Sequence, residues 1–225
     1  MQRNVATLVD LPKVEQLQII PFTPEEARVF LTAIEGDPHE ALYYVALGVG
    51  LRQGEILGLQ WDDVDLDEGL LTVRHTLQRV NREWRLVPPK TTRSRRTLPL
   101  PAIVVAKLRE HRAAQRREQL RRGGRPTEFD LVFTSATGTP LDDSNVTHGF
   151  PRILAAAGLR RMRFHDLRHS CATFILVQGA TMREVMETLG HSQIALTMNT
   201  YTHVLPSLQK ESAERMNRFL TGSEG

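Results

Sequence analysis

The stretch Phe164-His165-Asp166-Leu167-Arg168-His169 places a titratable ring and a permanent cation three residues apart at the expected start of a helix. Residues with this spacing share a helix face, so His165 and Arg168 can act together. A helix N-terminus attracts anions, and a guanidinium group beside it strengthens the attraction. The pattern favours an anion-binding site. The plainer alternative, a capped helix whose His165 and Arg168 meet solvent, stays open at this point.

Several other kinds of site are disfavoured by the sequence. His165 and His169 are four residues apart, as metal ligands on a helix can be, but partner ligands are scarce and no Glu lies between them, so we expect no metal. The glycines at 48, 50 and 54 lack the spacing of a dinucleotide-binding loop, and no Walker loop is present. Cys171 lies in an apolar run and is expected to be a small buried side chain rather than a nucleophile.

The composition is that of a globular protein. The chain has 225 residues, of which 40% are hydrophobic and 24% charged. The longest uncharged apolar stretch, 41–51, is too short to span a bilayer. No charged segment followed by an apolar run opens the sequence, so we expect no secretory signal, and the single cysteine excludes an internal disulfide. We therefore expect a cytoplasmic protein.

The charge is unevenly distributed. The net charge is only +3, yet residues 74–125 hold 16 Lys and Arg against 3 Glu, whereas residues 53–68 hold 6 acidic residues and no basic one. A concentrated positive field attracts polyanions, and nucleic acid phosphates are the usual target. The alternative is a solvated helix face that is rich in arginine.

The periodicity predicts a mainly helical domain with one small antiparallel sheet. Thr23-Pro24-Glu25-Glu26 and Thr181-Met182-Arg183-Glu184 are expected helix starts with capping boxes. Leu70–Val80 and Glu83–Val87 are predicted to form a hairpin around Asn81-Arg82. The remaining expected elements are a third strand at 95–98, a short strand at 131–133, and helices at 24–36, 39–49, 53–59, 101–122, 144–157, 166–178, 181–189, 194–203 and 207–220.

The three tyrosines lie in two different kinds of sequence environment. Tyr43 and Tyr44 lie in an apolar run and are expected in the core, whereas Tyr201 is flanked by Thr200 and Thr202, so its hydroxyl is the more exposed. His191 follows Gly190 at an expected helix end, ten residues before Tyr201.

These features resemble the catalytic domain of the tyrosine recombinases of the phage integrase family, from about Pro21 to Val204. Six positions occur in the family's order, and together they form a specific signal. The matching motifs are Gly50-Leu51-Arg52-Gln53-Gly54-Glu55-Ile56, Lys90 in the turn after the hairpin, His165-Asp166-Leu167-Arg168-His169, Leu189-Gly190-His191-Ser192, and Tyr201.

The resemblance implies that a tyrosine attacks a DNA phosphodiester, forms a 3′-phosphotyrosyl link and releases a 5′-hydroxyl, without metal, cofactor or ATP. Arg52 and Arg168 would clamp the phosphate, His165 would be the base and Lys90 the acid. His191 would bind the same phosphate or hold the nucleophile Tyr201, and Glu55 would support the arginine pocket. The candidate DNA-binding residues are Arg74, Arg79, Arg85, Arg93, Arg95 and Arg96.

The implied partner is double-stranded DNA with an attachment-type core site, bound by four protomers, whereas the free chain can be a monomer. We expect residues 1–20 to be an arm, 21–204 the catalytic domain, and 205–225 a C-terminal helix or tail. Leu208, Met216, Phe219 and Leu220 give that helix an apolar face, which either docks on a neighbouring protomer or folds back on its own core. Integrases usually carry a core-binding domain before the catalytic region, so this chain is either a fragment of a longer protein, which we favour, or a naturally short relative.

Two competing interpretations remain at this stage. A type IB topoisomerase uses a similar residue set and relaxes supercoils as a monomer, although the residues around Arg52 and His165 are more similar to an integrase. A DNA-binding protein with a degenerate site is the second alternative, and the complete set of six residues disfavours it.

Overall fold

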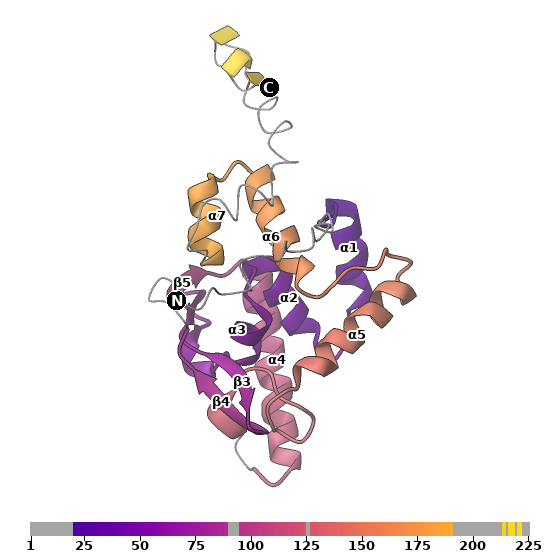
Figure 1. Ribbon diagram of the computed structural model, residues 1–225, viewed down its shortest axis with the longest axis vertical. Coiled ribbons are helices and arrows are strands. Elements are labelled where there is room, and N and C mark those ends of the chain that lie inside the picture. The colour runs from indigo at the N-terminus through magenta and orange to yellow at the C-terminus, as the bar shows by residue number, and fades with distance from the viewer. Residues whose placement is uncertain are drawn as a thin grey trace, which may run out of the picture.

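The computed structural model describes residues 20–89, 95–124 and 127–190, together with 213, 214, 216–218, 220 and 221. Helices dominate this part of the chain, as predicted, and antiparallel strands occupy positions between residues 64 and 99 (Figure 1). None of the helices in the described ranges combines the length and apolar character needed to cross a bilayer. The helices are α1 (Pro24–Ala33), α2 (Glu40–Val49), α3 (Gln53–Leu57), α4 (Ala102–Arg121), α5 (Asp143–Ala156), α6 (Asp166–Val177) and α7 (Met182–Leu189).

Both predicted capping boxes are present. The Thr23 hydroxyl accepts a hydrogen bond from the Glu26 N–H, and the Glu26 carboxylate accepts one from the Thr23 N–H, at 3.1 and 2.9 Å. The same reciprocal pair joins Thr181 and Glu184 at the start of α7. These bonds satisfy backbone donors that a helix start otherwise leaves free, so the two helices begin where the sequence predicted.

An aromatic cluster forms the centre of the core. Phe30 of α1 contacts Tyr43 of α2 and Phe150 of α5 edge to face, with both ring centroid distances at 5.6 Å. Phe164, just before α6, packs edge to face on Phe150 at 5.9 Å. The cluster fixes α2 against the start of α6. One arginine motif directly follows α2, and the other lies at the start of α6.

The strands form two small sheets rather than the single sheet predicted. The first has the order β1–β2–β5, and the second is the β3–β4 hairpin, whose turn residues Asn81 and Arg82 both have positive φ. The expected strand 70–80 is broken at Arg74, whose guanidinium donates to the Asp63 carboxylate at 3.0 Å and to the Asp62 carbonyl. The strands are β1 (Val64–Asp65), β2 (Leu70–Val73), β3 (Thr76–Val80), β4 (Glu83–Val87) and β5 (Arg96–Pro99).

The third predicted strand, 95–98, corresponds to β5. β5 pairs with β2, with Leu71 opposite Leu98, and not with the hairpin. The predicted strand at 131–133 is also wrong, because Leu131 makes only an isolated bridge to Gln60 after a short 3₁₀ helix, Glu128–Asp130. Between β5 and α5, α4 begins directly after Pro101, which was predicted to open it, and it buries Val104 and Leu108.

Several expectations concern residues outside the described ranges. They are the N-terminal arm, the helix at 194–203 and most of the helix at 207–220, including Leu208 and Phe219. Met216 and Leu220 lie in the described part and are exposed.

Candidate active site

The C-terminal end of α7 receives side chains from three arginines. Thr188, Leu189 and Gly190 are consecutive, and the carbonyl of each accepts a hydrogen bond from a different guanidinium group. The donors are Arg96 to Thr188 at 2.8 Å, Arg168 to Leu189 at 2.6 Å and Arg52 to Gly190 at 3.1 Å. The last carbonyls of a helix lack partners within the helix and form its negative end, so three cations stabilise this terminus.

Arg52 precedes α3 and is held by Glu55, one turn later. Its guanidinium donates to the Glu55 carboxylate at 2.8 Å, and its backbone N–H donates to the other carboxylate oxygen at 2.9 Å. Glu55 is buried, which raises its pKa, but hydrogen bonds and charge from Arg96 and Arg52 outweigh burial and hold the pKa below its ordinary value. Glu55 is therefore ionised at neutral pH, and Arg52, 38% exposed, meets solvent.

Arg168 lies on the first turn of α6 and is almost fully buried. Besides the Leu189 carbonyl, its guanidinium donates to the carbonyl of Gly50, at the end of α2. Gly50 has a φ of 71°, and a Cβ there would lie 2.9 Å from the Leu189 side chain. A larger residue at position 50 would press directly on the helix end that Arg168 binds.

His165 stands at the N-terminus of α6, three residues before Arg168. The side chain keeps access to solvent, while partial burial, then the charge of Arg168, lowers its pKa. The His169 ring lies 5.3 Å away, edge to face, and burial and His165 lower the pKa of His169 to about 4. Both imidazoles are therefore neutral at pH 7, and a neutral imidazole can accept a proton.

A buried hydroxyl fixes the start of α6. The Ser170 Oγ accepts a hydrogen bond from the Phe22 N–H at 2.9 Å and donates to the Asp166 carbonyl at 3.0 Å. The Asp166 carboxylate is itself held by Arg163 at 2.9 Å. Among the described residues, no group of three or more His, Cys, Asp and Glu side chains has a metal-binding arrangement.

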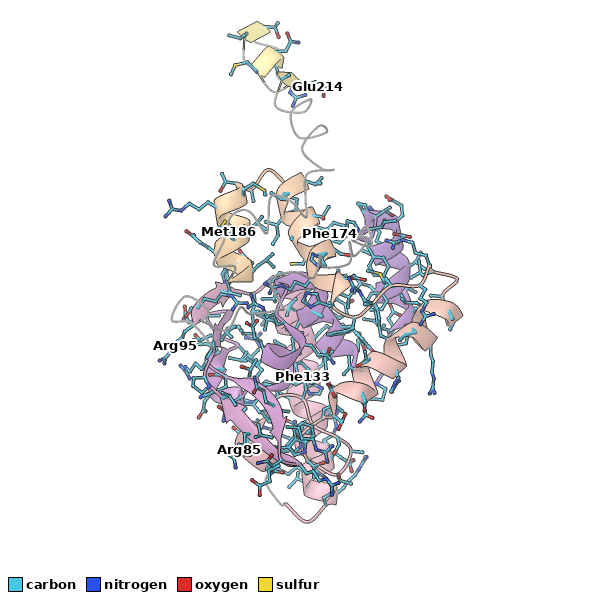
Figure 2. All side chains as sticks on the ribbon, viewed as in Figure 1. Arg85, Arg95, Phe133, Phe174, Met186 and Glu214 are labelled. Atoms are coloured by element: carbon cyan, nitrogen blue, oxygen red, sulfur yellow. The ribbon has the colours of Figure 1, made fainter. Side chains whose placement is uncertain are left out.

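The arginines predicted to bind DNA lie in three kinds of environment. Arg74 and Arg96 are engaged by Asp63 and Glu55: the Arg96 side chain is buried, whereas that of Arg74 is partly exposed. Arg79 pairs with Asp142 and lies over the Trp84 ring. Figure 2 shows Arg85 on the hairpin and Arg95 near β5 at the same side of the molecule, and both are exposed.

Four predicted site residues, Lys90, Arg93, His191 and Tyr201, lie outside the described ranges. The other two tyrosines are accounted for by packing, as predicted. Tyr43 is buried in the aromatic cluster, and the Tyr44 ring contacts the Lys107 ammonium.

Of the predicted site residues, the structure brings Arg52, Glu55, His165 and Arg168 together. The sequence did not reveal the role of Arg96, because its contact with Glu55 spans 41 positions. The Cys171 thiol is buried as expected, and burial raises its pKa to about 12.

Comparison with known proteins identifies the class of this chain. Residues 22–207 match the model of the phage integrase family. The chain is 37% identical over 214 residues to a tyrosine recombinase XerC-like protein of Caldanaerobacter subterraneus subsp. tengcongensis, covering 90% of this chain and 55% of that protein. It is 35% identical over 214 residues to an integrase of Streptomyces ambofaciens, covering 89% and 54%. The chain belongs to the phage integrase family, and it spans about half the length of these relatives.

Solved structures show the same fold. The Tn1549 transposon integrase, solved with transposon right end DNA, superposes with a TM-score of 0.77 at 23% identity, covering 96% of this chain and 70% of that one. XerA recombinase superposes with a TM-score of 0.70 at 24% identity, covering 89% and 66%. The tyrosine recombinase catalytic fold expected from the resemblance is therefore confirmed.

Proposed function

We propose that this chain is the catalytic domain of a site-specific DNA recombinase that cleaves and rejoins strands through a 3′-phosphotyrosyl intermediate. One observation carries the proposal: Arg52 and Arg168, from distant parts of the sequence, converge on one helix end beside His165. Two guanidinium groups and an imidazole at one place can bind a phosphodiester. They can stabilise its transition state, because negative charge builds up there on the non-bridging oxygens. Family membership supports the same activity.

The proposed cleavage step needs a nucleophile, a base and an acid, and the chain has a candidate for each. The Tyr201 hydroxyl attacks phosphorus, and the bond from phosphorus to the 5′-oxygen breaks. His165, neutral at pH 7, takes the tyrosine proton, and Lys90 gives a proton to the departing 5′-oxygen. Arg52 and Arg168 stabilise the phosphate charge, and the role proposed for His191 is to bind the same phosphate or to hold the tyrosine. Attack by a second 5′-hydroxyl reverses each step, so the cycle needs no metal and no ATP.

The proposed partner is double-stranded DNA carrying a core site. Structures with this fold include XerH site-specific recombinase bound to a difH substrate and a lambda integrase dimer bound to a core site. Recombination exchanges strands between two duplexes, so we propose four protomers in the working complex, inside a bacterial host cell. Exposure of Arg85 and Arg95 supports a role in phosphate contact, and Arg79 and Arg93 are further candidates.

The test is the capture of a covalent adduct. The intact protein is mixed with a pool of nicked suicide duplexes whose central sequence is randomised, and complexes that survive SDS are isolated and their DNA sequenced. We expect wild type to yield adducts on one recurring sequence. Tyr201→Phe should yield none while still binding that sequence, because phenylalanine lacks the nucleophilic oxygen.

Tyr44→Phe is the matched control, because it removes a hydroxyl from a tyrosine that packs against Lys107. It should form adducts as wild type does. An adduct that persists in Tyr201→Phe contradicts the assigned nucleophile. Relaxation of supercoiled plasmid without recombinants would point to a topoisomerase, and specific binding without any adduct would point to a protein that only binds DNA.

A further inference from the structure

We infer that Arg96 is a positioning residue of the same site, one that orients Arg52 through their shared carboxylate, Glu55. The inference rests on the proposed function. Arg96 follows the segment that carries Lys90, and β5, which it begins, packs against α7.

The contact between Arg96 and Glu55 is a buried, two-point clamp. Two guanidinium nitrogens of Arg96 donate to the two Glu55 oxygens, at 3.2 and 3.0 Å. The Arg96 side chain is 8% exposed and that of Glu55 3%. A forked contact of this kind fixes direction as well as distance, which a lysine cannot do.

Glu55 transmits this constraint to Arg52. The oxygen that accepts from Arg96 at 3.2 Å also accepts the guanidinium of Arg52 at 2.8 Å. With Arg96 in place, the carboxylate has one orientation and cannot turn to follow Arg52. Without Arg96, the Glu55 carboxylate would keep the backbone N–H and the guanidinium of Arg52, but it would lose the two bonds that fix it from outside the Arg52 motif.

Arg96 also fixes the helix end that Arg52 contacts. Its third nitrogen, Nε, donates to the Thr188 carbonyl, two residues before the Gly190 carbonyl bound by Arg52. The fit is close, because a Cβ on Gly190 would lie 2.9 Å from Arg96. One side chain therefore sets both ends of the contact that Arg52 makes, and His191 comes directly after Gly190.

The plainer role for Arg96 is to neutralise Glu55 and keep the protein folded. Three variants separate the two roles: Arg96→Gln, Arg96→Lys and the control Arg183→Gln. Arg183 lies on α7 and pairs with Glu187 on the surface, where ion pairs contribute little. Each variant is first checked for thermal unfolding, and its single-turnover adduct rate is then measured on the duplex selected with wild type, between pH 5 and 8.

We expect Arg96→Gln to slow adduct formation by about 10²-fold, the loss that a misplacement of about 1 Å causes, with DNA binding nearly unchanged. Arg96→Lys should recover only part of the rate. Loss of Arg96 removes a charge that lowers the pKa of Glu55, so the rate should also fall at a higher pH than in wild type as the solution is acidified. Arg183→Gln should match wild type in every respect.

The inference is overturned if folded Arg96→Gln forms adducts at the wild-type rate, or if its rate falls with an unchanged pH profile. If Arg96→Gln does not fold, Arg96→Lys decides: a wild-type rate and profile overturn the inference, and a slow rate with a shifted profile supports it. Absence of adduct from wild type itself would overturn the proposed function, and this inference with it.

Discussion

Gly50 offers the sharpest test of how the site is packed. Its φ of 71° is strained for any residue with a Cβ, and alanine in that conformation costs about 1–2 kcal/mol. A Cβ would also lie 2.9 Å from the Leu189 Cδ2 and 3.1 Å from the Cys171 sulfur. Overpacking of a filled core costs about 1–3 kcal/mol. Gly50→Ala should therefore lower the free energy of unfolding by about 2–5 kcal/mol.

Gly36 provides a matched control for the backbone part of that cost. Its φ is 78°, and a Cβ there would have no atom within 4 Å. Gly36→Ala should lose only the conformational part, about 1–2 kcal/mol. For a chain of this size 1 kcal/mol shifts the melting temperature by about 2–4 °C, so Gly50→Ala should melt about 2–12 °C below Gly36→Ala.

Calorimetry or circular dichroism on the two variants measures this difference, and the adduct assay gives a second readout. Because Gly50 also supplies a carbonyl to Arg168, and Leu189 supplies the other, Gly50→Ala should slow adduct formation while Gly36→Ala should not. Equal melting temperatures for the two variants would refute the packing argument. If the two variants differ in melting temperature but form adducts at the same rate, the conclusion that Gly50 affects catalysis through Arg168 is refuted.

Two further predictions concern α6. Arg168→Ala should reduce the adduct rate by about 10²–10³-fold, as removal of a charge stabiliser does, and it should also lower the melting temperature because the Gly50 and Leu189 carbonyls lose a buried donor. The pH profile of adduct formation tests His165: its pKa lies below the ordinary value of 6.5, so the rate should stay level from pH 8 to 7 and fall only as acid protonates the base below pH 6.5. A fall already complete at pH 7 would contradict that role.

The elements that the sequence predicts well are those that local chemistry determines. Both capping boxes join residues three positions apart, so Thr23 and Thr181 mark helix starts without reference to the rest of the chain. The Asn81-Arg82 turn is local as well, because its backbone conformation determines how the two strands return. The i, i+3 spacing of His165 and Arg168 is also local, whereas only the family resemblance implied that Arg52 would act on the same phosphate.

Contacts between distant parts of the chain could not be predicted in the same way. Alternation along residues 70–80 indicates strand but not partner, and the break at Arg74 depends on Asp63, eleven positions earlier. The pairing of β5 with β2 rather than with the hairpin is likewise a tertiary choice. Arg96 was expected to face DNA because it is basic, and only the fold shows that Glu55 captures it.

The groups at the end of α7 explain why a cluster of three arginines is stable in the absence of bound phosphate. Arg52 and Arg96 share one carboxylate, Glu55, and Arg168 binds the same helix end, so these three arginines exceed their carboxylate partner in charge. The three carbonyls at the negative end of α7 offset part of the repulsion without cancelling the charge, because they are dipoles and not ions. Arg52 is the arginine that meets solvent, whereas Arg168 and Arg96 are buried. A phosphate whose negative charge grows during strand cleavage would therefore meet Arg52 first and be stabilised by a field that the two buried arginines hold fixed.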